Sequence, residues 1–144
     1  MEITGSITTA RGVAERTAWR PADLRSPQPR HGLSARQVTR VLAHISSHFD
    51  GTIRNHELAA HAHLSPSHFC RVFRATFGTS PHRYLSLTRI ECAKLLMRDT
   101  RASLGDIAAE CGMADQAHLN RLFRRFVGTS PGAWRRDELA GAAV

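Results

Sequence analysis

The sequence predicts an all-α domain of about seven helices, with two helix-turn-helix lobes joined by a long linker helix. Three observations support this. Apolar residues recur at helical spacing from residue 33 onward, no segment alternates as a strand would, and one stretch occurs twice. We place the lobes at about 33–80 and 100–138 and the linker helix at about 81–98, within a domain of residues 33–144. Residues 1–32 are expected to be mostly disordered, because they lack a helical or strand period and contain three prolines.

The repeat joins two stretches that lie fifty residues apart, SHFCRVFRATFGTSP at 67–81 and AHLNRLFRRFVGTSP at 117–131. Eight of the fifteen aligned positions are identical, where about one match would arise by accident. Each copy follows a short apolar helix, so the repeated unit reads as a helix, a tight turn and a basic helix, which is a helix-turn-helix. Small residues in the first helix of each unit let it lie close to the second: Ala59, Ala60, Ala108 and Ala109.

Start and stop signals set the helices of the first lobe. Ser34 can cap one helix, and a short helix is expected at roughly 55–62. Ser65 and Pro66 then supply a hydroxyl N-cap and a proline at the first helical position, so the next helix spans roughly 66–77. The residues that this helix is expected to bury are Phe69, Val72, Phe73 and Phe77.

The second lobe follows the same order after the linker helix. Ser103 and Asp106 fit a capping box at the start of a short helix. Asp115 can cap the next helix, which runs to about residue 127, and a final short helix carries Trp134. The residues that the longer helix is expected to bury are Leu119, Leu122, Phe123 and Phe126.

The charge balance favours a polyanionic partner. The chain has 20 Lys and Arg against 12 Asp and Glu, a net charge of +8 and a pI near 11.1. Nucleic acid is the first candidate and an anionic membrane surface the second, while a coding bias toward arginine is the alternative source of the composition. The three cysteines form no CxxC pair, and no signal core or membrane-spanning stretch occurs. We therefore expect a reduced, cytoplasmic protein that does not bind membranes.

The second helix of each unit presents residue types that read DNA. Arginine can bind guanine through two hydrogen bonds, asparagine and glutamine can bind adenine, and basic side chains neutralise phosphates. The alternative is that these residues form a solvated charged face on an ordinary helix bundle. The occurrence of the same arginines in both copies of the repeat argues against this alternative. The candidate DNA-binding residues are Ser67, Cys70, Arg71 and Arg74 in the first unit, and Gln116, Asn120, Arg121, Arg124 and Arg125 in the second.

These residues resemble the DNA-binding domain of the AraC/XylS family of bacterial transcription regulators. The resemblance covers about residues 33–136 and is strongest in LSPSHFCRVFRATFGTSPHRYL, RIECAKLLM and IAAECGMADQAHLNRLFRRFVGTSPGAWRR. It implies two recognition helices that enter successive major-groove segments on one face of DNA. It also implies either a smaller stand-alone member or a C-terminal fragment of a larger regulator.

Three positions depart from the family's usual pattern. Arg54 stands where a capping Ser is usual, and Asn55 stands where an apolar core residue is usual, so the first helix-turn-helix is expected to be looser. Met113 replaces a common Phe, which exchanges one apolar side chain for another. Because Cys70 is a weak base reader, we expect the second lobe to carry more of the specificity, or Arg71 to act largely alone in the first.

Other chemistry has little support in the sequence. His56, His61 and His63 cluster, yet no CxxC or HExxH pattern accompanies them, so no metal or cofactor is expected. No nucleophile and base pair suggests an enzyme. The sequence predicts a sequence-specific transcription regulator that binds double-stranded DNA as a monomer, with RNA polymerase as a further candidate partner. A basic helical adaptor for an acidic protein, and a recombination or architectural accessory protein, are the alternatives.

Overall fold

The computed structural model describes residues 31–142, and within them every regular element is a helix. The prediction of an all-α fold of about seven helices is thereby confirmed for this part of the chain. The prediction of disorder for residues 1–32 falls, apart from His31 and Gly32, outside the described residues. The helices are α2 (Ala35–His48), α3 (Asn55–His61), α4 (Pro66–Phe77), α5 (Pro81–Asp99), α6 (Leu104–Glu110), α7 (Gln116–Val127) and α8 (Pro131–Ala142).

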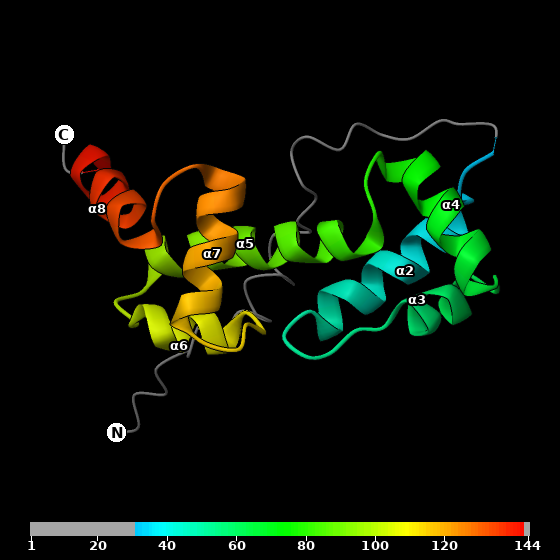
Figure 1. Cartoon of the computed structure of the whole chain (residues 1–144), viewed down its shortest axis with the longest axis horizontal. Coiled ribbons are helices and arrows are strands. Elements are labelled where there is room, and N and C mark those ends of the chain that lie inside the picture. Colours follow the sequence, from blue (N-terminus) through cyan, green and yellow to red (C-terminus); the bar gives the residue numbers. More distant parts are fainter. Residues whose placement is uncertain (1–30, 143–144) are drawn as a thin grey trace, which may run out of the picture.

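Helix α5 separates two groups of three helices (Figure 1). Helices α2, α3 and α4 lie at one end of α5, where α3 packs against both α2 and α4. Helices α6, α7 and α8 lie at the other end, and all three pack against α5. With 19 residues, α5 is about 28 Å long at 1.5 Å per residue. We call these two groups the first lobe and the second lobe.

Serine hydroxyls begin five of these helices, including α8, where the Ala133 amide donates to Ser130 Oγ at 3.2 Å. The Oγ atoms of Ser65, Ser80 and Ser103 each accept a hydrogen bond from the amide three residues later, at 3.4, 3.2 and 3.1 Å. At α2 the capping is reciprocal, because Gln37 N donates to Ser34 Oγ and Ser34 N donates to Gln37 Oε1. These local bonds satisfy amides that a helix leaves unpaired, which is why the predicted starts match the structure closely.

The start of α3 differs from the other starts, as the departure at Arg54 predicted. Arg54 supplies no side-chain cap, and the exposed Asn55 adds nothing to the core. Glu57 partly compensates, because its Oε2 accepts a hydrogen bond from the Arg54 amide at 3.4 Å. Whether this makes the first helix-turn-helix looser stays a prediction.

The two copies of the repeat end in the same way. Gly78 and Gly128 take left-handed conformations, with φ of 71° and 91°, and their amides donate to the carbonyls of Arg74 and Arg124. Glycine adopts this conformation without the clash that a Cβ atom would cause. The same sequence therefore turns the chain out of α4 and out of α7.

Aromatic side chains fill the core of the first lobe. The Phe73 ring contacts the rings of Phe69, Phe77 and Tyr84, with centroids 4.5 to 5.6 Å apart. Because Tyr84 belongs to α5, this cluster attaches the linker helix to the first lobe. In the second lobe Phe123 meets Trp134 edge to face at 5.7 Å.

Three side chains that were expected to be buried are only half-buried: Val72, Leu122 and Phe126. The fully buried stripe of each helix is narrower than predicted. It runs through residues four apart, Phe69 and Phe73 in α4, and Leu119 and Phe123 in α7. Val72, Leu122 and Phe126 flank these stripes and pack against the edge of the core.

Gly112, which follows α6, is a point of close contact between the second lobe and the first. Its φ is 77°, and a Cβ atom added to it would lie 2.6 Å from the carbonyl oxygen of Phe49 and 2.9 Å from the backbone of Asp50. The end of α6 therefore lies directly against the chain that leaves α2. A side chain at position 112 would force the two lobes apart.

We expect Gly112→Ala to destabilise the protein more than Gly128→Ala. Both changes force alanine into a left-handed conformation, at about 1–2 kcal/mol. At Gly128 nothing lies within 4 Å of an added Cβ atom, whereas at Gly112 the added atom clashes with the backbone. This overpacking adds about 1–3 kcal/mol to the cost of Gly112→Ala. Urea unfolding of both variants measures the difference, and equal losses in the free energy of unfolding would contradict the close approach.

Candidate nucleic-acid interface

Helices α3 and α4 form the first helix-turn-helix. The Leu64 amide donates to the Ala59 carbonyl at 3.0 Å, and His63 closes the turn with a φ of 57°. Ala59 is buried between the helices, but Ala60 is exposed, so the expectation that both alanines bring the helices together is wrong for Ala60. The paired position in the second unit behaves likewise, with Ala108 buried and Ala109 exposed.

Helices α6 and α7 form the second helix-turn-helix with one extra residue in its turn. The Met113 amide donates to the Ala108 carbonyl at 2.8 Å, which matches the bond in the first turn. Ala114 is the additional residue, and its amide donates to Nδ1 of His118 at 3.2 Å. Asp115 then caps α7 by accepting from the His118 amide at 2.7 Å. The ring of His118 therefore supports the turn, a role that the sequence did not indicate.

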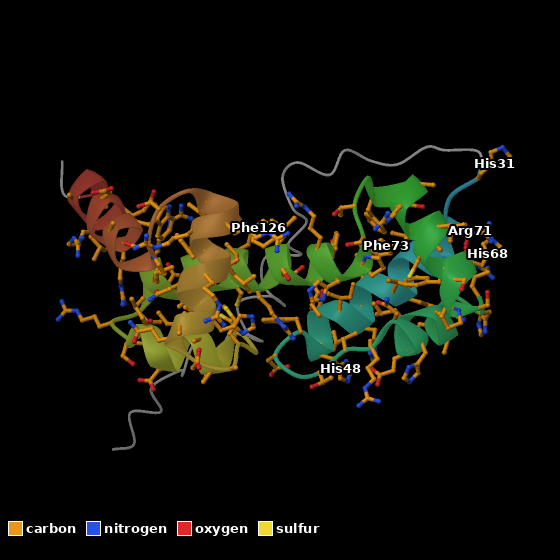
Figure 2. The ribbon with its side chains drawn as sticks, viewed as in Figure 1. His31, His48, His68, Arg71, Phe73 and Phe126 are labelled. Carbon is orange, nitrogen blue, oxygen red and sulfur yellow. The ribbon has the colours of Figure 1, made fainter. Side chains whose placement is uncertain are left out.

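The outer face of α4 carries the residues predicted for the first lobe. Ser67, Arg71 and Arg74 are exposed, and Cys70 is half-buried. Figure 2 shows Arg71 and His68 on α4 at the end of the molecule farthest from the second lobe. This face can offer two arginines and one hydroxyl to a partner.

The outer face of α7 carries the residues predicted for the second lobe. Gln116, Arg121, Arg124 and Arg125 are exposed, and Asn120 is half-buried. This face has three arginines and two amide side chains, so it is more basic than the face of α4 and offers more hydrogen-bonding groups. We call these two sets of residues the α4 face and the α7 face.

The arginines of these faces differ from the structural arginines of the chain. Within residues 31–142, the guanidinium groups of Arg71, Arg74, Arg121 and Arg124 make no hydrogen bond or ion pair with the protein. Arg135, by contrast, donates to the carbonyls of Met97, Thr100 and Ala102 at 3.2, 2.6 and 2.7 Å. These hydrogen bonds satisfy carbonyls at and just after the C-terminal end of α5. The arginines of the α4 and α7 faces thus keep all their donors available for an anion or a base edge.

Arg89 is a further structural arginine that sequence reasoning missed. From the middle of α5 its Nε donates to the Phe49 carbonyl at 2.8 Å and its Nη2 donates to the Gly51 carbonyl at 2.7 Å. Burial lowers the pKa of Arg89 from its ordinary value. Phe49 and Gly51 belong to the loop after α2, and Gly112 contacts the same loop. Arg89 and Gly112 together therefore hold the two lobes in one arrangement. We call this contact the lobe junction.

The histidines that lie near one another in the sequence have different partners in the structure. His61 stacks on His44, which in turn stacks on His48, with ring centroids 4.2 and 4.3 Å apart. His63 instead lies 2.8 Å from Arg40 through its Nε2. Desolvation lowers the pKa of His44, as do the nearby imidazoles. In the described part of the chain, no group of three or more His, Cys, Asp or Glu residues could hold a metal ion.

The cysteines have two different settings. Cys92 in α5 and Cys111 at the end of α6 are both buried, and a hydrogen bond with Cys92 together with burial raises the pKa of the Cys111 thiol. Cys70 is half-buried on α4. Among the described helices, none is long and apolar enough to cross a lipid bilayer.

Comparisons with known proteins point to one family. The profile of a family described as "Helix-turn-helix domain" matches residues 58–137. The HTH-type transcriptional regulator Rv1931c of Mycobacterium tuberculosis is 40% identical over 86 residues, which cover 60% of this chain and 33% of that protein. The HTH-type transcriptional activator RhaS of Escherichia coli is 35% identical over 98 residues, 68% of this chain and 35% of RhaS. The chain thus spans about a third of these relatives.

Solved structures give the same result for the fold. The DNA-binding domain of AdpA, a global transcriptional factor solved in complex with a target DNA, is 31% identical with a TM-score of 0.68, over 74% of this chain and 96% of that one. The C-terminal domain of AraT, a response regulator from Geobacillus stearothermophilus, is 27% identical with a TM-score of 0.67, over 73% of this chain and 87% of that one. The similarity therefore covers nearly all of both solved domains.

We expect Arg89→Lys to lower the free energy of unfolding by about 1–3 kcal/mol, because one ammonium group cannot replace the guanidinium fork at two carbonyls. Arg98→Lys is the matched control on the same helix. Arg98 makes an exposed ion pair with Glu138 at 2.9 Å, and its replacement should cost less than about 1 kcal/mol. Denaturant unfolding compares the two. A loss in Arg89→Lys no larger than the loss in Arg98→Lys would show that the junction contributes little.

Proposed function

The chain belongs to the AraC family of helix-turn-helix DNA-binding domains, and on that premise we propose that it is a sequence-specific transcription regulator. The proposal rests on the α4 face and the α7 face, which are rich in arginine and whose guanidinium groups make no hydrogen bond or ion pair within residues 31–142. Their arginines are free to bind phosphates and base edges of duplex DNA. RNA polymerase is the second partner that such a regulator would engage.

The residues of the two faces would divide the work. Arg71 and Arg121 occupy the same position of the repeat, and we assign them to base reading through paired hydrogen bonds to guanine. Ser67 and Cys70 would line the first reading surface, and Gln116 and Asn120 the second. The remaining arginines would hold phosphates and position the domain: Arg74, Arg124 and Arg125.

The fold supports a two-part binding site for a single chain. Helix α5, which connects the two lobes, is about 28 Å long, and this length is comparable to the 34 Å or so between successive major-groove segments on one face of DNA. The α4 and α7 faces carry different residues, so the site would not be a palindrome. We propose an asymmetric site of about 20 base pairs, with two boxes centred about 10 to 10.5 base pairs apart and one chain bound.

Two variants of α7 test the division of work. Arg121→Ala should cost about 1–3 kcal/mol of binding free energy and relax the preference at one base pair. Arg124→Ala should weaken binding to all sequences alike and reduce the slope of log K against log salt by about 0.9. Selection from random DNA and salt titration measure the two effects.

Arg36→Ala is the control, because it removes an exposed charge from α2, outside both faces. Unchanged affinity and preference in Arg121→Ala would refute the reading role. An unaltered chain that binds all DNA alike would favour the architectural alternative. Binding to an acidic protein with no binding to DNA would favour the adaptor.

A further inference from the structure

The ring of Phe126 lies beside two arginines that come from different helices. The guanidinium carbon of Arg83 is 5.1 Å from the ring centroid, and that of Arg125 is 5.5 Å from it. Arg83 belongs to the first turn of α5, where the chain has just left the first lobe. Phe126 and Arg125 belong to the last turn of α7, in the second lobe. The group therefore joins the start of α5, next to the first lobe, to the end of α7 in the second lobe.

The two guanidinium groups share one aromatic ring and carry the same charge. Because both distances end on one ring centroid, their carbons lie at most 10.6 Å apart, the sum of those distances. In the part of the chain that the structure describes, neither guanidinium pairs with a carboxylate. The electron-rich ring stabilises the cations without using their N–H donors. Two cations on one ring, both with free donors, attract an anion.

The position of the group indicates which anion it fits. Arg125 lies one turn beyond Arg121 on the exposed side of α7, so it continues the α7 face. Arg83 follows the turn that ends α4, and Figure 2 shows Phe126 at the edge of α7 toward the first lobe. The group thus lies between the two reading helices. DNA that fills two successive major-groove segments presents its phosphate backbone between them, with one phosphate every 3.4 Å or so of axis per strand.

We propose that Arg83 and Arg125, held on the ring of Phe126, form a clamp for the DNA phosphates between the two boxes. The inference rests on the proposed function and adds Arg83 and Phe126 to its contacts. The clamp needs residues from both sides of the molecule, so it binds fully only when α4 and α7 occupy their boxes together. It contributes affinity and fixes the spacing of the boxes, and it does not read sequence.

The test combines Arg83→Gln with DNA in which single phosphates between the boxes are replaced by neutral methylphosphonates. Wild-type protein should lose about threefold to tenfold in affinity at one or two of these positions. Arg83→Gln should lose a similar factor on unmodified DNA, with a salt slope smaller by about 0.9, and should lose less than the wild type does at those positions, where only Arg125 remains. Its base preference should equal that of the wild type.

Arg98→Gln is the matched control, because it removes the same charge near the other end of α5, where Arg98 packs on Trp134 at 4.9 Å. It should keep the wild-type slope and the wild-type phosphate pattern. Phe126→Leu keeps an apolar side chain but removes the ring, and should weaken the same phosphate positions while both charges remain. Thermal unfolding of each variant checks that it is folded.

An Arg83→Gln variant with the wild-type slope and the wild-type phosphate pattern would overturn the clamp. If the chain in that case still binds DNA specifically, and this binding depends on Arg121, the proposed function is retained. Absence of specific binding by the wild-type chain would refute the proposed function itself. The two failures are therefore distinguishable.

Discussion

Arg89 donates two hydrogen bonds from the middle of α5 to the carbonyls of Phe49 and Gly51, and Gly112 presses against the same loop. Placing a guanidinium group in a partly buried site is costly unless its donors are satisfied, and here two carbonyls satisfy them. Without this lobe junction, the lobes would be connected through α5 and the aromatic cluster around Tyr84. With it, the first lobe, α5 and the second lobe are held together, and the separation of α4 and α7 is a property of the fold.

The repeat gives the two lobes similar local structure, while the α4 and α7 faces carry different residues. Identical residues fix the local geometry, namely the glycine that ends each basic helix and the Ser-Pro pair that begins the next one. Some of the positions that differ lie on the α4 and α7 faces, where Ser67 corresponds to Ala117 and Cys70 corresponds to Asn120. Substitution on an exposed face costs little stability, so the two surfaces can differ while the packing is kept. Our proposal of an asymmetric site depends on this difference.

Most of the fold could be predicted from the sequence because its signals are local. Ser65 with Pro66, and the glycine at 78, act within one turn of the residues that they order, so the predicted span of α4 equals the observed one. The contacts of Arg89 and of Arg83 with Phe126 join residues about forty apart, and nothing near them in sequence indicates a partner. The signal for Arg89 was its position four residues after the buried Leu85, which places it on an inward side of α5. The residues of the α4 and α7 faces could be predicted from the sequence, whereas the roles of these residues in DNA binding stay predictions.

The central claim is that one chain carries two reading helices at a fixed separation. The most direct measurement is the affinity for two-box DNA when five base pairs are inserted between the boxes, with the number of bound chains measured by sedimentation. A half turn moves the second box to the opposite face of the duplex, where a rigid chain cannot reach it. The account predicts one chain on the original site and a fall to the affinity of a single box after the insertion. Equal affinity for both DNAs, or two chains on a palindromic footprint, would contradict it.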